Sequence, residues 1–105
     1  MRHRTFAPRC ATKGIHDVLP QSMKLKLFEY VDRQVSSGLD MDYLQIFEFS
    51  TKVINSKYHQ CIVHRQEVPL RSVEYTICDT DAPLDLTVWI VDEETHATML
   101  LPEEY

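Results

Sequence analysis

The chain has 105 residues, of which 44% are hydrophobic and 26% are charged, and its formal net charge is −5. This length and composition are typical of one globular domain, and we expect residues 1–105 to form it. The acidity argues against tight, sequence-independent binding to nucleic acid. No apolar run approaches the roughly 18 residues that a membrane-spanning helix needs. No apolar segment of the kind found in signal peptides follows the basic residues at the start.

The charge is distributed unevenly along the chain. Residues 1–26 carry six Lys or Arg and one acid, whereas residues 27–105 carry five Lys or Arg and fifteen acids. Either the basic end folds back on an acidic body, or the acidic surface mimics or repels nucleic acid. The three cysteines, Cys10, Cys61 and Cys78, are odd in number and follow no disulfide-framework spacing. Reduced thiols of a cytoplasmic protein explain them most simply.

The first predicted elements are a short strand and one convincing helix. The strand covers Thr5–Thr12, and Pro8 inside it favours either an edge strand or a late start at Arg9. The helix covers Pro20–Ser37, because proline suits the first helical position and Gly38 suits a left-handed C-terminal cap. Residues 15–19 only lead into this helix.

One side of the predicted helix is apolar. At 100° per residue the apolar side holds Met23, Leu27, Phe28, Tyr30, Val31 and Val35. Leu25 breaks this pattern, and Lys24 lies inside the apolar stripe. We expect Lys24 to lay its stem on the apolar side while its ammonium stays in water.

Alternating patterns predict strands in the rest of the chain. The predicted strands are Asp42–Ser50, Tyr58–Glu67, Val73–Cys78, Leu84–Asp92 and His96–Leu101. Residues 51–57 connect the first two, with the turn at Asn55-Ser56. The last two form a hairpin with Asp92 opposite Thr95, although Glu93-Glu94 suits a two-residue turn poorly and the loop could be a residue or two longer. One face of this hairpin then holds Leu86, Val88, Ile90, Ala97, Met99 and Leu101.

The predicted order is therefore β-α-β-β-β-β-β, an α+β fold. We expect a mainly antiparallel sheet of five to six strands with the helix packed on one face. The other face would carry Trp89, Val91 and Leu100 with aromatic residues from 43–49. Either the sheet curls on itself, or this face is an apolar patch that binds a partner, which could be a second copy of the chain.

The most unusual stretch is polar on both strand faces: His64 and Gln66 point one way, and Arg65 and Glu67 the other. It fits an exposed strand end with cross-strand ion pairs, a partner or ligand surface, or acid–base chemistry centred on His64. No nucleophile, second acid or glycine-rich loop lies at a meaningful offset. We therefore predict no catalytic residue, and a partner-binding surface formed by these four residues together with Trp89.

Two other groups contain metal-ligating residue types: His59, Cys61 and Cys78, and Asp79, Asp81 and Asp85. The first group lacks the Cys-x-x-Cys or His-x-x-x-His spacing of a zinc site. The second lacks the glycine and the terminal glutamate of a calcium loop. We interpret them as a buried thiol and turn formers, and predict no metal and no cofactor.

Four separated motifs resemble the small family catalogued as domain of unknown function 960. They are Arg9–Ile15 (RCATKGI), Asp42–Glu48 (DYLQIFE), His64–Pro69 (HRQEVP) and Thr98–Tyr105 (TMLLPEEY). The resemblance covers nearly the whole chain from Arg9 onward. It implies a small cytoplasmic protein of Gram-positive bacteria, their phages and conjugative elements, and it implies no activity, cofactor or catalytic residue.

Two functions remain open at this point. The first is a non-enzymatic interaction protein of bacterial or mobile-element origin, a regulator or an inhibitor of a host nuclease or defence protein. The alternative is a nucleic-acid-associated accessory factor that uses the basic segment with Arg2, Arg4 and Arg9. A small-ligand or weak enzymatic role at His64 would require a concave pocket there.

Overall fold

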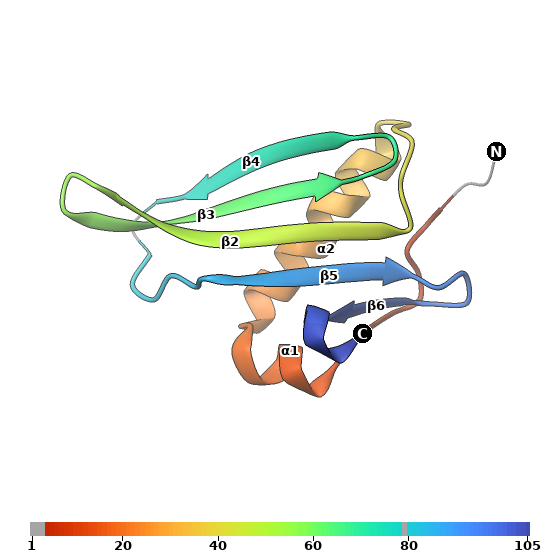
Figure 1. Ribbon diagram of the computed structural model, residues 1–105, viewed down its shortest axis with the longest axis horizontal. Coiled ribbons are helices and arrows are strands. Elements are labelled where there is room, and N and C mark those ends of the chain that lie inside the picture. The colour runs from red at the N-terminus through yellow and green to blue at the C-terminus, as the bar shows by residue number, and fades with distance from the viewer. Residues whose placement is uncertain (1–3, 79) are drawn as a thin grey trace.

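Six strands form one mixed sheet, and a long helix packs across one of its faces (Figure 1). The computed structural model describes residues 4–78 and 80–105. The strand order is β1-β6-β5-β2-β3-β4. The strands are β1 (Arg9–Ala11), β2 (Leu44–Ile54), β3 (Lys57–Gln66), β4 (Arg71–Ile77), β5 (Leu86–Asp92) and β6 (Ala97–Leu100). The predicted α+β class is confirmed.

The strand β1 makes the sheet mixed, because it runs parallel to β6 while the other neighbours are antiparallel. Ala97 N–H donates to Pro8 O at 2.8 Å, and Thr12 N–H donates to Met99 O at 3.0 Å. The late start at Arg9 is confirmed, so the strand is shorter than the predicted Thr5–Thr12.

Two helices follow β1, where one was predicted. They are α1 (Lys13–Val18) and α2 (Gln21–Ser36). The expectation that residues 15–19 are only a lead-in is wrong, because Thr12 caps a short helix and its Oγ1 accepts from Ile15 N at 3.3 Å. Gly38 follows α2 with φ of 76°, as predicted for a left-handed cap. No helix in the described ranges has the length and apolar content needed to cross a membrane.

The apolar side of α2 contributes to one core with the sheet. Its buried residues are Lys24, Leu27, Phe28, Tyr30, Val31 and Gln34. The helix packs over the inner side chains of the sheet, including Phe47, Ile62, Val88, Ile90 and Met99, each 0% exposed. The expectation for Lys24 is wrong, since its side chain is buried and only 8% of the residue is exposed.

The hairpin of β2 and β3 is longer than predicted. Both strands continue through the expected connection to the turn at Asn55 and Ser56, which have φ of 52° and 64°. Residues with such left-handed backbone suit a tight hairpin turn. The hairpin reaches beyond α2 at the left of Figure 1, where Val53 is 64% exposed.

The register of β5 and β6 differs from the prediction by two residues. Asp92 lies opposite Ala97, rather than opposite Thr95, and a four-residue loop joins the strands. Glu94 occupies a left-handed conformation in that loop, with φ of 73°. A shift of two residues keeps each side chain on its face, so Ile90 and Met99 lie in the core as expected.

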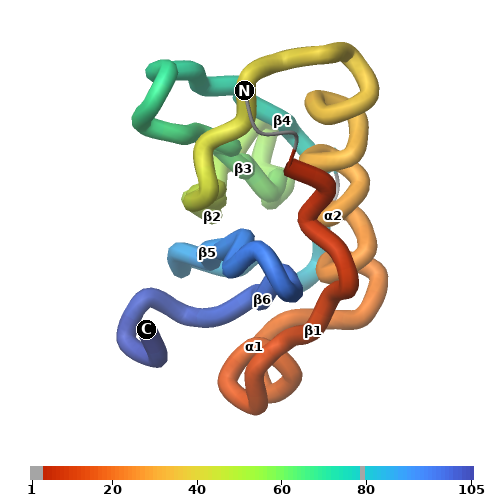
Figure 2. The backbone as a smooth tube through the Cα atoms, turned by 90° about the vertical axis from the view of Figure 1, so that its right-hand side faces the viewer, coloured from red at the N-terminus to blue at the C-terminus, as the bar shows by residue number. Residues whose placement is uncertain are grey.

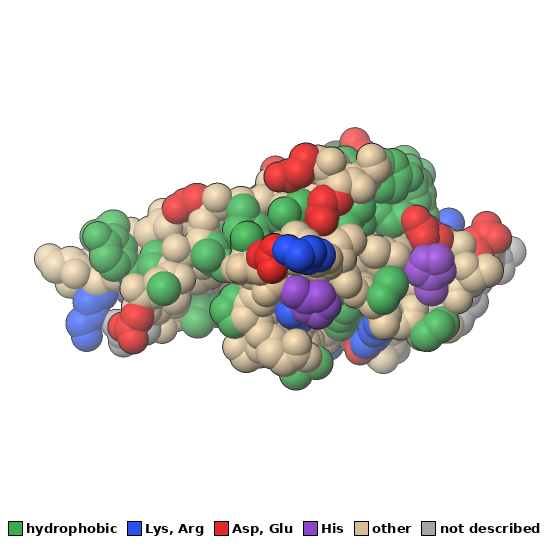
Figure 3. Space-filling view, turned by 90° about the horizontal axis from the view of Figure 1, so that it is seen from below, with side chains coloured by type: hydrophobic (Ala, Val, Ile, Leu, Met, Phe, Trp, Pro, Cys, Tyr) green, Lys and Arg blue, Asp and Glu red, His purple; other side chains and the backbone are tan. Residues whose placement is uncertain are grey.

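The sheet face away from α2 is partly covered by the C-terminal residues. Ile46, Val91 and Leu100 on this face are at most 5% exposed. The 3₁₀ helix η1 (Pro102–Glu104) folds back in front of β5 and β6 (Figures 1 and 2). In Figure 3, hydrophobic side chains still gather along the upper right of the molecule, on the side that faces away from α2.

Candidate functional site

The two inward-pointing residues of the predicted His64–Glu67 surface lie in a buried polar network. His64 Nε2 donates to Gln45 Oε1 at 2.7 Å, which leaves Nδ1 to accept from Gln34 Nε2 at 3.5 Å. The imidazole also stacks on the Phe47 ring, with centroids 4.3 Å apart. The network therefore links α2, β2 and β3 in the layer between the helix and the sheet.

Gln66 connects this network to the two neighbouring loops. Its Oε1 accepts from Gln45 Nε2 at 2.9 Å and from Arg71 Nη2 at 3.0 Å. Its Nε2 donates to Asp40 O at 3.0 Å and to Pro69 O at 2.9 Å. One buried amide thus holds the loop between α2 and β2 against the turn between β3 and β4.

The surroundings of His64 keep its imidazole neutral. Burial, and to a smaller extent the Arg71 guanidinium, lowers the pKa of His64 from 6.5 to about 4. A buried imidazolium would lack water and would face a like charge. The residue therefore acts in this network as a neutral hydrogen-bonding group.

The structure divides the predicted partner-binding residues. His64 and Gln66 are each 1% exposed, so the prediction that they touch a partner is wrong. The two side chains share one strand face, as predicted, and α2 covers that face. Arg65 is half-buried on the opposite face, where its Nε donates to Glu48 Oε1 at 3.1 Å across the strands, and Glu67 is exposed.

Directly after these residues, the β3–β4 turn presents large apolar side chains to solvent. Val68 is 74% exposed and Leu70 is 83% exposed. Val68 N–H donates to Asp42 Oδ2 at 3.0 Å, so this turn and the α2–β2 loop lie side by side. The same loop and the start of β2 expose Leu39 and Tyr43 by 42% and 45%. We call Leu39, Tyr43, Val68 and Leu70 the apolar apex.

The sequence contains a signal for one part of the apolar apex. Val68 and Leu70 flank Pro69, and large apolar residues are uncommon in a turn. That pattern does not reveal the neighbouring loop with Leu39 and Tyr43, which is held close by hydrogen bonds from Gln66, Val68 and Arg71.

Trp89, the fifth predicted partner-binding residue, lies on the sheet face away from α2. It is half-buried, and its ring meets the edge of Tyr105 with centroids 5.7 Å apart. It lies opposite Ile46 on β2 and Leu100 on β6. Because Ile46 also lies opposite Arg65, Trp89 and Arg65 stand in one row of the sheet, separated by β2, whereas Glu67 lies in the turn that follows β3.

The residue types considered as metal ligands do not gather into a site in the described ranges. Among those residues, no group of three or more His, Cys, Asp and Glu side chains could hold a metal ion. Cys61 is 3% exposed, as expected for a buried thiol, whereas Cys78 is exposed. Asp79 lies outside the described residues.

Fold and site together define a small α+β protein with a mixed six-stranded sheet, one covering helix and an exposed apolar apex above a buried polar network. The family model described as "Staphylococcal protein of unknown function (DUF960)" matches residues 8–104. The chain therefore belongs to the DUF960 family, and the resemblance seen in its sequence motifs is confirmed.

One solved structure shares this fold over its full length. It is described as a protein of unknown function from Enterococcus faecalis, and the similarity has a TM-score of 0.71 at 22% sequence identity. The match covers 100% of this chain and 96% of that chain. No curated protein matches the sequence significantly.

Proposed function

We propose that this protein is a non-enzymatic interaction protein that binds another protein through the apolar apex. The observation that carries the proposal is the 74% and 83% exposure of Val68 and Leu70 on a turn anchored by hydrogen bonds to Asp42 and Gln66. Because hydrogen bonds already hold the backbone of this turn, a partner that covers it needs to order less of the loop, and more of the contact energy appears as affinity.

The charges around the apex indicate the chemistry of the partner. Asp40 and Glu67 are exposed next to the apex residues, and the chain has a net charge of −5. Such a surface fits an apolar pocket rimmed by Lys and Arg side chains. This supports the narrower proposal of a regulator or an inhibitor that occupies the basic nucleic-acid channel of a host nuclease or defence protein.

The burial of His64 supports a non-enzymatic role for this region. Its imidazole is stacked on Phe47, both ring nitrogens are engaged, and only 1% of the residue is exposed. A general base must reach the proton that it abstracts, either directly or through one water. A substrate outside the molecule does not reach this ring.

The proposal is tested with two matched double variants. Val68→Ser/Leu70→Ser removes exposed apolar side chains from the apex, and Val53→Ser/Ile54→Ser removes 64% and 45% exposed side chains from the β2–β3 hairpin. Each variant and the natural protein are used to capture proteins from a nuclease-treated staphylococcal lysate, followed by mass spectrometry. The captured protein is then purified and its Kd measured by calorimetry.

We expect one partner whose affinity falls at least about tenfold in the apex variant, which corresponds to about 1.4 kcal/mol, and stays unchanged in the hairpin variant. Equal binding by both variants, or capture that nuclease treatment abolishes, would contradict the proposal. A His64 substitution is a poor test, because it would disturb the core as well as the apex.

A further inference from the structure

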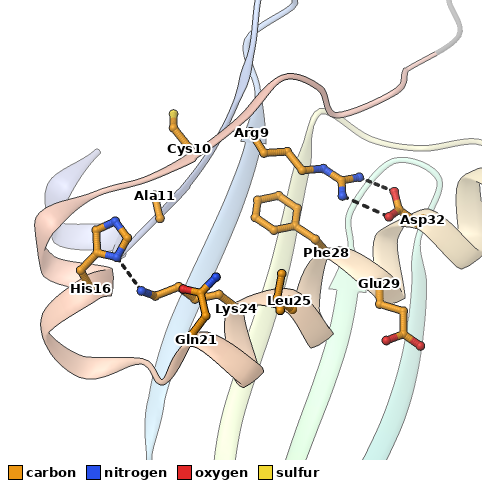
Figure 4. Close-up of a pocket in the computed structure, with 10 residues that line it drawn as sticks. All are labelled: Arg9, Cys10, Ala11, His16, Gln21, Lys24, Leu25, Phe28, Glu29 and Asp32. Atoms are coloured by element: carbon orange, nitrogen blue, oxygen red, sulfur yellow. Dashed lines mark hydrogen bonds and ion pairs between the residues drawn. The ribbon is translucent and has the colours of Figure 1, made fainter.

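A groove of about 620 Å³ lies between β1 and α2, away from the apolar apex (Figure 4). Ala11 and Cys10 of β1 form one wall, and Leu25 and Phe28 of α2 contribute apolar surface to the other. His16 of α1 closes one end beside Lys24. The groove has a volume in the range of ligand-binding clefts.

Lys24 differs from the other charged groups of this groove. Arg9 forms a bidentate ion pair with Asp32, and Glu29 pairs with Arg33. Lys24 is 8% exposed, and its Nζ donates to His16 Nδ1 at 2.5 Å. No carboxylate of the described residues forms an ion pair with it. Its charge is therefore buried against a hydrogen-bond acceptor that does not carry the opposite charge.

The position of Lys24 in its helix adds to this imbalance. It lies in the first turn of α2, where the exposed N–H groups give the helix end a partial positive charge. A cation is unfavourable at this end, and burial without a counter-ion is also unfavourable. A carboxylate bound in the groove would pair with the Lys24 ammonium and so reduce both unfavourable effects.

The backbone of β1 adds a second recognition element along the groove. β1 is the outermost strand on its side of the sheet. The parallel pairing turns the backbone hydrogen-bonding groups of Pro8, Cys10 and Thr12 toward β6. Alternate residues direct their backbone groups to opposite sides, so the N–H and C=O of Arg9 and Ala11 point away from β6. An extended peptide pairs with such an edge by strand addition.

We propose that this groove binds the C-terminal end of an extended peptide. The terminal carboxylate pairs with Lys24 beside His16, the backbone adds to the edge of β1, and an apolar side chain lies on Leu25 and Phe28. This second binding surface is separate from the apolar apex, so each is tested by variants that leave the other intact.

The test uses ¹⁵N NMR titration with two pools of acetylated pentapeptides built from uncharged residues. One pool ends in a free carboxylate and the other in a carboxamide. Hexanoate, which has a carboxylate and an apolar chain but no peptide backbone, is titrated separately. The proteins are the natural chain, Lys24→Met and the matched control Lys26→Met, whose lysine does not line the groove.

We expect the carboxylate pool to shift the amide signals of Arg9 and Ala11 and to bind at least tenfold more tightly than the carboxamide pool. Lys24→Met should abolish that difference, and Lys26→Met should preserve it. Absence of binding by the carboxylate pool, or equal binding of both pools, would overturn the proposal. Hexanoate binding as tightly as the peptide pool would overturn the role of the β1 edge.

A measurement without ligand checks the same assignment. Replacing a buried, uncompensated ammonium by a methionine of similar length should raise the Tm of the free protein, whereas Lys26→Met should leave it nearly unchanged. A clear fall in the Tm of Lys24→Met would show that the lysine is held for stability, and would overturn the proposed anion site.

Discussion

At the scale of single residues, the region around His64 stabilises the apex without touching a partner. Buried polar groups cost free energy unless their hydrogen bonds are satisfied. His64 Nε2 donates to Gln45 Oε1 and Nδ1 accepts from Gln34 Nε2, so the imidazole must be neutral to fit. The neutral state of His64 therefore links the acidity of the solution to the stability of the fold.

We predict that the protein loses stability as the pH falls from 7 to 5. The pKa of His64 is about 4 in the folded chain and near 6.5 when unfolded, so the unfolded state binds more protons in this window. The contribution is fully present above pH 6.5 and is lost as the pH falls toward 4. Between pH 7 and 5 the loss is about 2 kcal/mol, measured by urea unfolding at each pH.

The control for this prediction is His64→Gln, which keeps a polar side chain but does not titrate. Its free energy of unfolding should be lower at pH 7 and should change less between pH 7 and 5. An equal pH dependence in the natural protein and the variant would assign the effect to other groups.

The sequence was sufficient to place these side chains on strand faces, but not to predict their burial. The period of two puts His64 and Gln66 on one face, and the structure confirms this. Their polarity suggested an exposed strand end. His64 can be buried because the side-chain amides of Gln34 on α2 and Gln45 on β2 form hydrogen bonds with its ring nitrogens. These two glutamines lie 30 and 19 positions away from His64 in the sequence.

At the scale of elements, α1 is the feature that local pattern could not predict. It has six residues, one of which is Gly14, and isolated helices of this length are not stable. Its N-terminal end is held by Glu104, which accepts from Thr12 Oγ1 at 2.6 Å and from Gly14 N at 3.2 Å. That partner lies about 90 residues along the chain.

We predict that Thr12→Ala destabilises the protein by about 1 kcal/mol, the usual effect of losing a helix N-cap. The hydroxyl both caps α1 and donates to Glu104, so Thr12→Ser should retain most of the stability. Chemical unfolding of the two variants measures the difference. Equal losses in both would mean that the methyl group, and not the hydroxyl, stabilises this junction.

The longer elements were predictable because their patterns extend over many residues. The apolar stripe of α2 and the alternation of β5 and β6 identified the core faces correctly. The exact register of the last hairpin was not predictable, because it depends on the conformation of the loop, where Glu94 has φ of 73° and Asp92 Oδ1 accepts from Glu94 N.

At the scale of the whole molecule, the basic start of the chain folds back on acidic residues. Arg4 Nη1 lies 3.2 Å from Asp92 Oδ2, and Arg9 pairs with Asp32. Arg2 lies outside the described residues. Partners inside the molecule compete with phosphate for these guanidinium groups, which favours the fold-back interpretation over a nucleic-acid role.

We predict no salt-dependent binding of labelled single-stranded or duplex DNA or RNA. A protein that binds phosphates with several basic residues loses affinity steeply between about 50 and about 200 mM salt. Fluorescence anisotropy at both salt concentrations measures this. Salt-sensitive binding that is lost in Arg4→Gln/Arg9→Gln would favour the accessory-factor alternative.

The parallel pair of β1 and β6 also determines when the molecule can mature during synthesis. Arg9 pairs with Ala97, so β1 leaves the ribosome long before β6, its partner in the sheet. Contacts between such distant residues form late, because the intervening chain must first be ordered. The edge of β1, and with it the groove beside α2, is therefore assembled only after β6 has been synthesised, and a nascent chain without β6 should not bind the peptide.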